Sequence, residues 1–178
     1  EEQRFFKKSV FELSLGYLIR HGYLTPPIKI DSPVACYDFS SLIERTAATS
    51  FAMADIEGIL KCQERVTPGI VKNILEIAAD RQGVMIFTAS VRHAEEIMSY
   101  LPPECSAIVV GDTISSEREL IITRFKNREL KFLVNVSVLT TGFDAPHVDL
   151  IALLRPTESV SLYPVSYTHL RAHETLRY

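Results

Sequence analysis

Four apolar runs separated by helical patterns constrain the fold of this chain more than any other feature. The runs are GVMIFTAS (83–90), SAIVV (106–110), KFLVNVSVL (131–139) and HVDLIALL (147–154). Strands that are apolar on both faces and separated by helices of about 10 to 14 residues form parallel sheets with right-handed crossovers. We therefore expect an α/β fold, with a doubly wound parallel sheet flanked by helices.

Two helices are expected in the gaps between these runs. Ser90 should cap the first helix, and the Pro102-Pro103 pair should end it. Ser116 and Glu119 have the spacing of a capping box for the second helix. The residues expected on the buried faces are Ala94, Ile97, Met98 and Leu101 in the first helix, and Ile121, Ile122 and Phe125 in the second.

The part of the chain before Gly83 has weaker patterns. Thr67 and Pro68 form an N-cap and first-turn pair for a helix that continues to about Asp80. Its expected buried face consists of Ile70, Ile74, Leu75 and Ala78. Earlier segments predict a helix over 54–65, a short strand and then a helix closed by Gly22, a turn at Pro26-Pro27, and one or two edge strands over 28–39.

Composition is typical of a soluble globular domain. The chain has 178 residues, of which 47% are hydrophobic and 23% charged, enough for one domain with a buried core. No apolar run approaches the roughly 18 residues of a membrane span, so no membrane partner is expected. The widely separated Cys36, Cys62 and Cys105 predict neither a disulfide framework nor a zinc site, which favours a reduced cytoplasmic compartment. The net charge of −3 identifies no partner.

Three loops after apolar runs share a polar chemistry. They are TAS (88–90), GDT (111–113) and LTTGFDAP (139–146). The carboxyl ends of parallel strands meet at one edge of a sheet, where loop amides and helix N-termini carry positive partial charge. Hydroxyls and amides of this kind contact phosphate backbones, so we expect a ligand site at this edge. Helix capping alone also explains Ser90 and Ser116, and Asp144 can instead form an Asx turn before Pro146.

Several motifs of nucleotide hydrolases are missing from the sequence. It has no G-x-x-x-x-G-K-[ST], no G-x-G-x-x-G and no Asp-Glu dipeptide, so it contains neither a P-loop nor an acidic pair for Mg²⁺. The histidines predict no nucleophilic triad. We expect His21 at a helix C-terminus, His93 on a solvated helix face and His147 in a turn.

The same stretches, in order, resemble the second RecA-like lobe of superfamily 2 helicases, in which LTTGFDAP corresponds to motif V. The segments HGYLTPP (21–27), YDFS (37–40) and RPTESVSLY (155–163) extend the resemblance to the RadD family of bacterial DNA-repair ATPases. It covers residues 10–163. The resemblance implies that residues 1–30 connect two lobes and begin this one, and that residues 31–163 form a RecA-like helicase C-terminal domain that stops before motif VI.

The resemblance also implies roles for individual residues. Thr140 and Thr141 would contact the DNA backbone, and Gly142 and Asp144 would contact ATP. Four more residues would extend the DNA-binding surface: Thr88, Ser90, Gly111 and Thr113. ATP with Mg²⁺ would be the cofactor of the full-length parent, held between its two lobes, and this lobe alone would hold none.

Partners and location follow from the same resemblance. The expected partners are single-stranded or branched DNA, the first RecA-like lobe of the parent chain and DNA-repair proteins, in the bacterial cytoplasm near the nucleoid. Because the first lobe and motif VI are not in the sequence, we expect no ATP hydrolysis by this chain alone. Residues 164–178 follow no hydrophobic period, and 165–175 resembles a translated sequencing adapter, so we treat 164–178 as a non-native tail outside the predicted fold.

Two other interpretations stay open at this point. The lobe could be a docking module for repair proteins, with LTTGFDAP as a structural remnant. It could also belong to a related superfamily 2 translocase, such as a restriction subunit, because motif V is shared across the superfamily.

Overall fold

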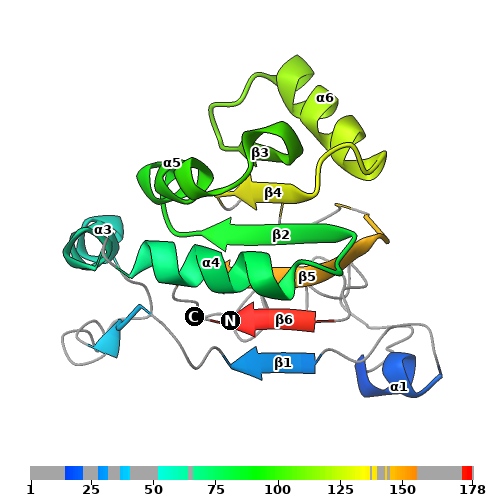
Figure 1. Cartoon of the computed structure of the whole chain (residues 1–178), viewed down its shortest axis with the longest axis horizontal. Coiled ribbons are helices and arrows are strands. Elements are labelled where there is room, and N and C mark those ends of the chain that lie inside the picture. Colours follow the sequence, from blue (N-terminus) through cyan, green and yellow to red (C-terminus); the bar gives the residue numbers. More distant parts are fainter. Residues whose placement is uncertain are drawn as a thin grey trace, which may run out of the picture.

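A computed structural model describes residues 15–21, 28–31, 37–40, 52–63, 66–136, 138–139, 143, 145–155 and 174–177. Its centre is a six-stranded sheet in which every pair of neighbouring strands is parallel (Figure 1). The strands are β1 (Ile28–Asp31), β2 (Gly83–Thr88), β3 (Ser106–Val109), β4 (Phe132–Asn135), β5 (Val148–Leu154) and β6 (Glu174–Arg177), in the order β1-β6-β5-β2-β4-β3. The predicted parallel α/β sheet is confirmed.

The central strands have no exposed face. Every residue of β2 and β4 is buried, and β5 is buried except at Asp149. Strands covered on both faces are what the continuous apolar runs predict. The strand expected near residue 28 is also confirmed, because β1 lies at the edge of the sheet.

Strand β6 corrects the predicted fold. The sequence interpretation left residues 164–178 out of the fold, whereas Glu174–Arg177 pairs in parallel with β5 on one side and β1 on the other. Every residue other than proline carries a backbone donor and acceptor, so a segment without hydrophobic period can still add to a sheet. The adapter origin of the segment stays a prediction.

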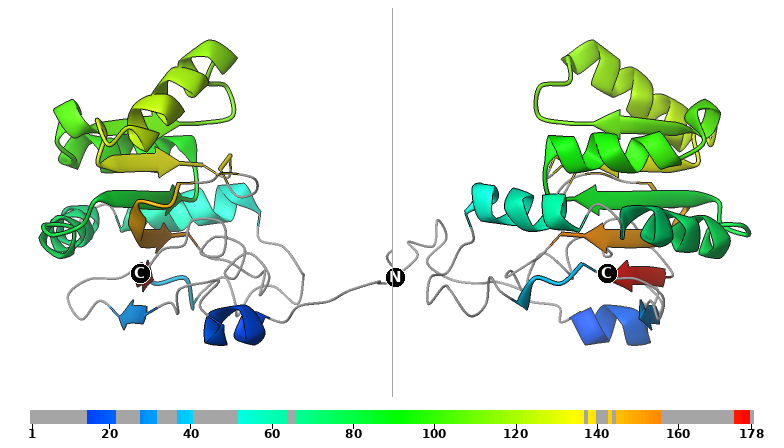
Figure 2. Two further views of the ribbon diagram at one scale, coloured as in Figure 1. Left: turned by 90° about the vertical axis from the view of Figure 1, so that its right-hand side faces the viewer. Right: turned by 60° about the vertical axis from the view of Figure 1, so that its left-hand side comes forward.

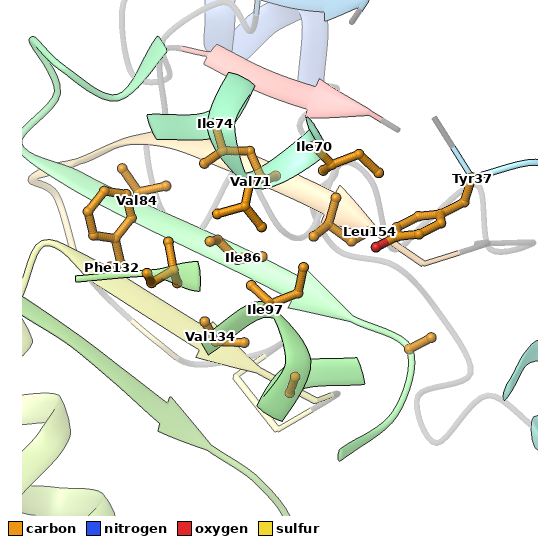
Figure 3. Close-up of a cluster of buried hydrophobic side chains, with 14 of the residues drawn as sticks. Tyr37, Ile70, Val71, Ile74, Val84, Ile86, Ile97, Phe132, Val134 and Leu154 are labelled. Atoms are coloured by element: carbon orange, nitrogen blue, oxygen red, sulfur yellow. The ribbon is translucent and has the colours of Figure 1, made fainter. Parts of the chain in front are cut away.

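Two helices pack against one face of the sheet, α4 (Thr67–Ile77) and α5 (Val91–Tyr100), and α3 (Met53–Cys62) adds Ile56 and Leu60 to the same buried cluster from beyond the carboxyl ends of the strands (Figure 1). Figure 2 shows α4 and α5 on the same side of the strands. Their buried side chains meet alternate residues of the strands, and Figure 3 shows part of this cluster, including Ile70, Val71, Ile74, Val84, Ile86, Ile97, Phe132, Val134 and Leu154. Each fully buried aliphatic side chain contributes about 1.5–3 kcal/mol, so the cluster on this face stabilises the lobe substantially.

The other face is covered by α6 (Ser115–Lys126) and by the connection from β4 to β5. Phe125 of α6 is fully buried there, as predicted, while Ile121 and Ile122 are partly buried. The described part of the β4–β5 connection contains no helix. Its apolar side chains Leu139, Phe143 and Ala145 instead pack on the sheet.

The start and end of α5 follow the sequence closely. The Ser90 hydroxyl oxygen accepts a hydrogen bond from the backbone N–H of His93 at 3.3 Å, so the predicted N-cap is confirmed. The helix ends at Tyr100, before the proline pair, and a short 3-10 helix, η1 (Pro103–Cys105), leads into β3.

Two other predicted caps are wrong. Thr67 is the first residue of α4 rather than its cap, because its hydroxyl is buried and bonds to the Tyr37 hydroxyl at 2.9 Å. Ser116 lies inside the first turn of α6 and is exposed, and Ile114 stands at the N-cap position without a side-chain bond. The capping box of Ser116 and Glu119 therefore does not form.

Near the N-terminus, the predicted helix is present as α1 (Leu15–Arg20). His21 follows it, with Nδ1 2.9 Å from the Tyr17 carbonyl oxygen and its ring stacked on Tyr17 at 3.9 Å between centroids. This is the C-terminal position expected for His21. Gly22, the Pro26-Pro27 turn and the short strand predicted before α1 lie outside the described residues.

The start of β2 is tightly packed against the turn before β5. Asp149 accepts hydrogen bonds from the backbone N–H of Gln82, at 3.2 and 3.1 Å to its two carboxylate oxygens, and from that of Gly83 at 3.3 Å. A Cβ on Gly83 would lie 2.7 Å from Cδ2 of His147 and 3.2 Å from its carbonyl oxygen. His147, which lies in the predicted turn, therefore comes so close to β2 that only glycine fits at position 83.

Replacing Gly83 with alanine should lower the free energy of unfolding by about 1–3 kcal/mol, because the new methyl group overlaps the His147 backbone and ring. The control is Gly58→Ala in α3, where nothing lies within 4 Å of the new Cβ. That change should instead raise stability by up to about 1 kcal/mol, because alanine favours helix. Urea unfolding of the two variants measures both effects, and equal midpoints for Gly83→Ala and the unchanged chain would contradict the clash.

Candidate nucleic-acid and nucleotide interface

The carboxyl ends of β5, β2, β4 and β3 lie level at one edge of the sheet. Asn135, the last residue of β4, pairs with Phe87 of β2 and with Val109, the last residue of β3. Thr88 ends β2 and pairs with Leu154, which ends β5. The three polar loops therefore leave the sheet at the same edge, as their positions in the sequence indicate.

Thr88 and Ser90 are both buried at this edge. Thr88 is 0% exposed, and its Oγ1 donates to the Asn135 carbonyl oxygen at 3.3 Å. Ser90 is 6% exposed and caps α5. Both hydroxyls are engaged within the lobe in this arrangement, and the DNA contacts expected from them stay predictions.

The loop after β3 forms a closed turn. Thr113 Oγ1 accepts from the Val110 N–H at 2.9 Å, and the Thr113 N–H donates to the Val110 carbonyl oxygen at 3.2 Å. Gly111 is exposed, and no atom lies within 4 Å of the position of a Cβ on it. The loop therefore combines a fixed backbone with an open surface at Gly111.

Arg118 of α6 holds this loop in place. Its Nη2 lies 3.2 Å from the Val110 carbonyl oxygen, 3.1 Å from that of Gly111 and 3.3 Å from that of Thr113. Hydrogen bonds from a charged donor contribute about 1.5–3 kcal/mol, more than neutral ones. The guanidinium also brings positive charge to the loop. The sequence interpretation missed Arg118, whose one local signal is its place in the first turns of the helix that follows the loop.

The stretch LTTGFDAP is attached to the core by its apolar residues. Leu139, Phe143 and Ala145 are 8%, 6% and 0% exposed. The Phe143 ring lies 6.3 Å from the Phe125 ring of α6, and Lys126 Nζ lies 5.5 Å from the Phe143 ring centroid. The residues expected to contact DNA or ATP, namely Thr140, Thr141, Gly142 and Asp144, lie outside the described residues, so their roles stay predictions.

Two more side chains at this edge were missed from sequence. Arg155 follows β5 and is partly buried, and this burial lowers the pKa of its guanidinium. Asn135, at the end of β4, is fully buried. Asn135 lies inside an apolar run and Arg155 begins the segment RPTESVSLY, so neither was assigned to this edge from sequence, and the register of the strands brings them there.

His93 is not on a solvated face, which corrects the sequence interpretation. It is 2% exposed, and its Nε2 lies 3.0 Å from the Tyr37 hydroxyl, which also bonds to Thr67. Burial lowers the pKa of His93 to about 4 and raises that of Tyr37 to about 12. Both groups are therefore neutral near pH 7. The prediction failed because the covering residue, Tyr37, is 56 positions away in the sequence.

A second pair of hydrogen bonds fixes the segment 37–40. The Asp38 N–H donates to Gln63 Oε1 at 2.8 Å, and Gln63 Nε2 donates to the Asp38 carbonyl oxygen at 2.9 Å. A shallow depression lies nearby, beside the start of α5. It is lined by Glu57, Leu60, Lys61, Ser90, Arg92, His93 and Glu96. Its acidic and basic side chains balance, so charge alone favours neither an anion nor a cation there.

Other site types have little support in the described part of the chain. No group of three His, Cys, Asp or Glu side chains there could hold a metal ion. Cys62 and Cys105 are free thiols, and Cys36 lies outside the described residues. No described helix is long and apolar enough to cross a membrane.

The fold and the shared loop edge define a RecA-like α/β lobe. The structure of Mycobacterium smegmatis helicase Lhr bound to ssDNA and AMP-PNP has the same fold, with a TM-score of 0.62 at 18% identity, over 86% of this chain and 19% of that one. Residues 68–172 match the family model of the helicase conserved C-terminal domain. The chain belongs to that helicase family, and the predicted RecA-like helicase fold is confirmed.

Curated relatives agree with this assignment. The putative ATP-dependent helicase IRC3 of Saccharomyces cerevisiae is 29% identical over 122 residues, which are 66% of this chain and 18% of that protein. UvrABC system protein B of Synechococcus sp. is 27% identical over 161 residues, covering 77% of this chain and 24% of that protein. The chain therefore spans a quarter or less of the length of these relatives.

The buried His93 should make stability fall in mild acid. Its pKa is about 4 in the folded chain and 6.5 in an unfolded chain, so the unfolded state binds the proton more strongly. The stability that neutral His93 provides is complete above pH 6.5 and is lost as pH falls toward 4, a loss of about 2–3 kcal/mol. Urea unfolding at several pH values should show this loss in the unchanged chain and not in His93→Gln. The control Tyr37→Phe should keep it, because its cause is burial.

Proposed function

We propose that this chain is the second lobe of a two-lobed ATPase of the RadD type that acts on DNA in repair. The observation that carries the proposal is the level ending of β5, β2, β4 and β3, which brings the loops after β2, β3 and β4 to one edge. At this edge, the stretch LTTGFDAP contacts both ligands. Thr140 and Thr141 bind the DNA backbone, while Gly142 and Asp144 bind ATP.

The attachment of LTTGFDAP to the core supports a ligand role for this stretch. Its described residues Leu139, Phe143 and Ala145 are buried in the cluster beneath it, so the stretch is anchored at three positions. Anchoring of this kind lowers the entropy cost of ordering a loop when it binds a ligand. One loop that touches both ligands also couples ATP turnover to the grip on DNA.

The surface of the neighbouring loop supports DNA as the partner. Arg118 brings a cation that balances the exposed Asp112 in residues 110–113, and Gly111 leaves the surface there open to a phosphate. Gly111 and Thr113 extend the contact with the same DNA, while Thr88 and Ser90, whose buried hydroxyls bond within the lobe, hold the end of β2 and the start of α5 beside it. Phosphate contacts of this kind position a nucleic acid without reading its sequence.

The relatives support ATP and repair for the whole protein. IRC3 is named as an ATP-dependent helicase, UvrB belongs to the UvrABC system, and Lhr was solved with ssDNA and AMP-PNP. In the parent, ATP and Mg²⁺ lie between this lobe and the first lobe, which supplies the P-loop. We accordingly propose that the chain alone does not hydrolyse ATP.

Single-stranded DNA binding by the chain tests the edge directly. Displacing the counterions of about two or three phosphates gives a slope of log K against log salt of about −2. Gly111→Asp should weaken binding about tenfold, because it adds a negative charge beside the phosphates without a steric clash. Fluorescence anisotropy with labelled oligo-dT, measured across a salt series, provides both values.

The matched control is Gly16→Asp in α1, which makes the same charge change at another open glycine, near the opposite ends of the strands (Figure 1). It should leave the affinity within about twofold of the unchanged chain, because exposed charges more than a Debye length of about 10 Å away are screened. A flat salt dependence, or equal losses in the two variants, would favour the docking module over the DNA-binding lobe.

Asp144→Ala in the two-lobed parent separates the two halves of the loop. ATP turnover should fall by about tenfold or more, while DNA affinity changes by less than about threefold, since only the nucleotide contact is removed. Steady-state ATPase assays and DNA titrations measure the two effects. A larger loss of DNA affinity than of turnover would mean that the roles within LTTGFDAP are reversed.

A further inference from the structure

Asn135 is a fully buried side chain without hydrogen bonds. It ends β4 and is 0% exposed. In the part of the chain that the structure describes, neither the oxygen nor the nitrogen of its side-chain amide has a partner. Buried amides are paired in most proteins, because an unpaired polar group loses its bonds to water and gains nothing in return.

The amide lies on the face that the β4–β5 connection covers. Side chains alternate along a strand, so Asn135 is on the same face as Leu133. Leu133 belongs to the cluster that contains Leu139 and Phe143, the apolar anchors of LTTGFDAP. Asn135 therefore ends β4 on the same face as Leu133, and Leu133 packs in one cluster with the apolar anchors of LTTGFDAP.

Packing and backbone bonds do not explain why asparagine occupies this position. Thr88 donates to the backbone carbonyl of Asn135, a contact that any residue would provide. An apolar side chain of similar size would fill the same space without an unpaired amide, as Leu133 does two positions earlier. Groups that lower the stability of a lobe in this way are typical of functional sites.

We propose that Asn135 is a positioning residue for nucleic-acid binding, whose amide bonds to the backbone of the β4–β5 connection when nucleic acid is bound. The proposal rests on the proposed function of this edge. Pairing of the amide stabilises only the bound arrangement, so it adds to the affinity for nucleic acid. Asn135 acts through the connection and does not itself touch the ligand.

The test compares Asn135→Leu with Ser106→Ala. Ser106 is the first residue of β3, so it lies at the amino ends of the strands, away from the candidate site. It is 8% exposed, and its Oγ also lacks a partner among the described residues. Both changes remove a buried unpaired group, so Tm should rise by about 2–6 °C for Asn135→Leu and by less for Ser106→Ala. Only Asn135→Leu should weaken binding of labelled oligo-dT, by about tenfold.

These outcomes separate positioning from folding. A variant that is more stable than the unchanged chain cannot lose affinity through unfolding. Equal affinity of Asn135→Leu and the unchanged chain for oligo-dT would overturn the positioning role. If Tm does not rise for Asn135→Leu, the claim that the Asn135 amide is unpaired in the unbound lobe is overturned. A buried water bonded to the amide would give this result.

Hydrogen exchange separates failure of this proposal from failure of the proposed function. If the unchanged chain does not bind oligo-dT, the DNA-binding role of the edge fails. The exchange of the backbone amides of Val138, Leu139 and Phe143 still decides the role of Asn135. Asn135→Leu should change their protection while Ser106→Ala does not. Equal protection in all three proteins would overturn the link between Asn135 and the connection.

Discussion

Parallel pairing of β2 with both β4 and β5 is the constraint on which the rest of this lobe depends. Parallel neighbours cannot be joined by a tight turn, so each connection must cross a face of the sheet before the next strand begins. The crossings bury β2 on both sides and collect the loops that follow the strands at a single edge. The candidate site is therefore a consequence of strand direction. A polar residue reaches the shared edge if it follows an apolar run closely in the sequence.

The two faces of the sheet are closed in different ways. On the face covered by α4 and α5, two contacts attach the segment 37–40. The Tyr37 hydroxyl forms a buried hydrogen bond with His93, and the Gln63 side-chain amide both accepts from and donates to the backbone of Asp38. On the other face, α6 shares the covering with the β4–β5 connection. The helical face is thus specialised for stability, while the second face serves packing and the candidate site at once.

Local signals in the sequence predicted local structure well. The apolar runs located β2, β3, β4 and β5, and Ser90 was recognised as a cap because its partner is the backbone three residues later. Thr67 and His93 were misplaced because both meet Tyr37, which lies 30 and 56 residues away and carries no pattern that links it to them. Arg118 bonds to backbone carbonyls, which have no signature in any sequence. The roles given to Thr140 and Asp144 came from family resemblance, and the fold alone would not have supplied them.

The three anchors of LTTGFDAP have a consequence for how this lobe can vary. Leu139, Phe143 and Ala145 belong to one cluster with Phe125 and Phe87, so the candidate loop is attached to the lobe by side chains of the core itself. A change of volume at Phe125 cannot be absorbed by the core alone, because close-packed interiors transmit strain to their neighbours. A substitution that repacks this part of the core therefore also moves the anchors of LTTGFDAP, so residues of the core and of this candidate loop are expected to vary together.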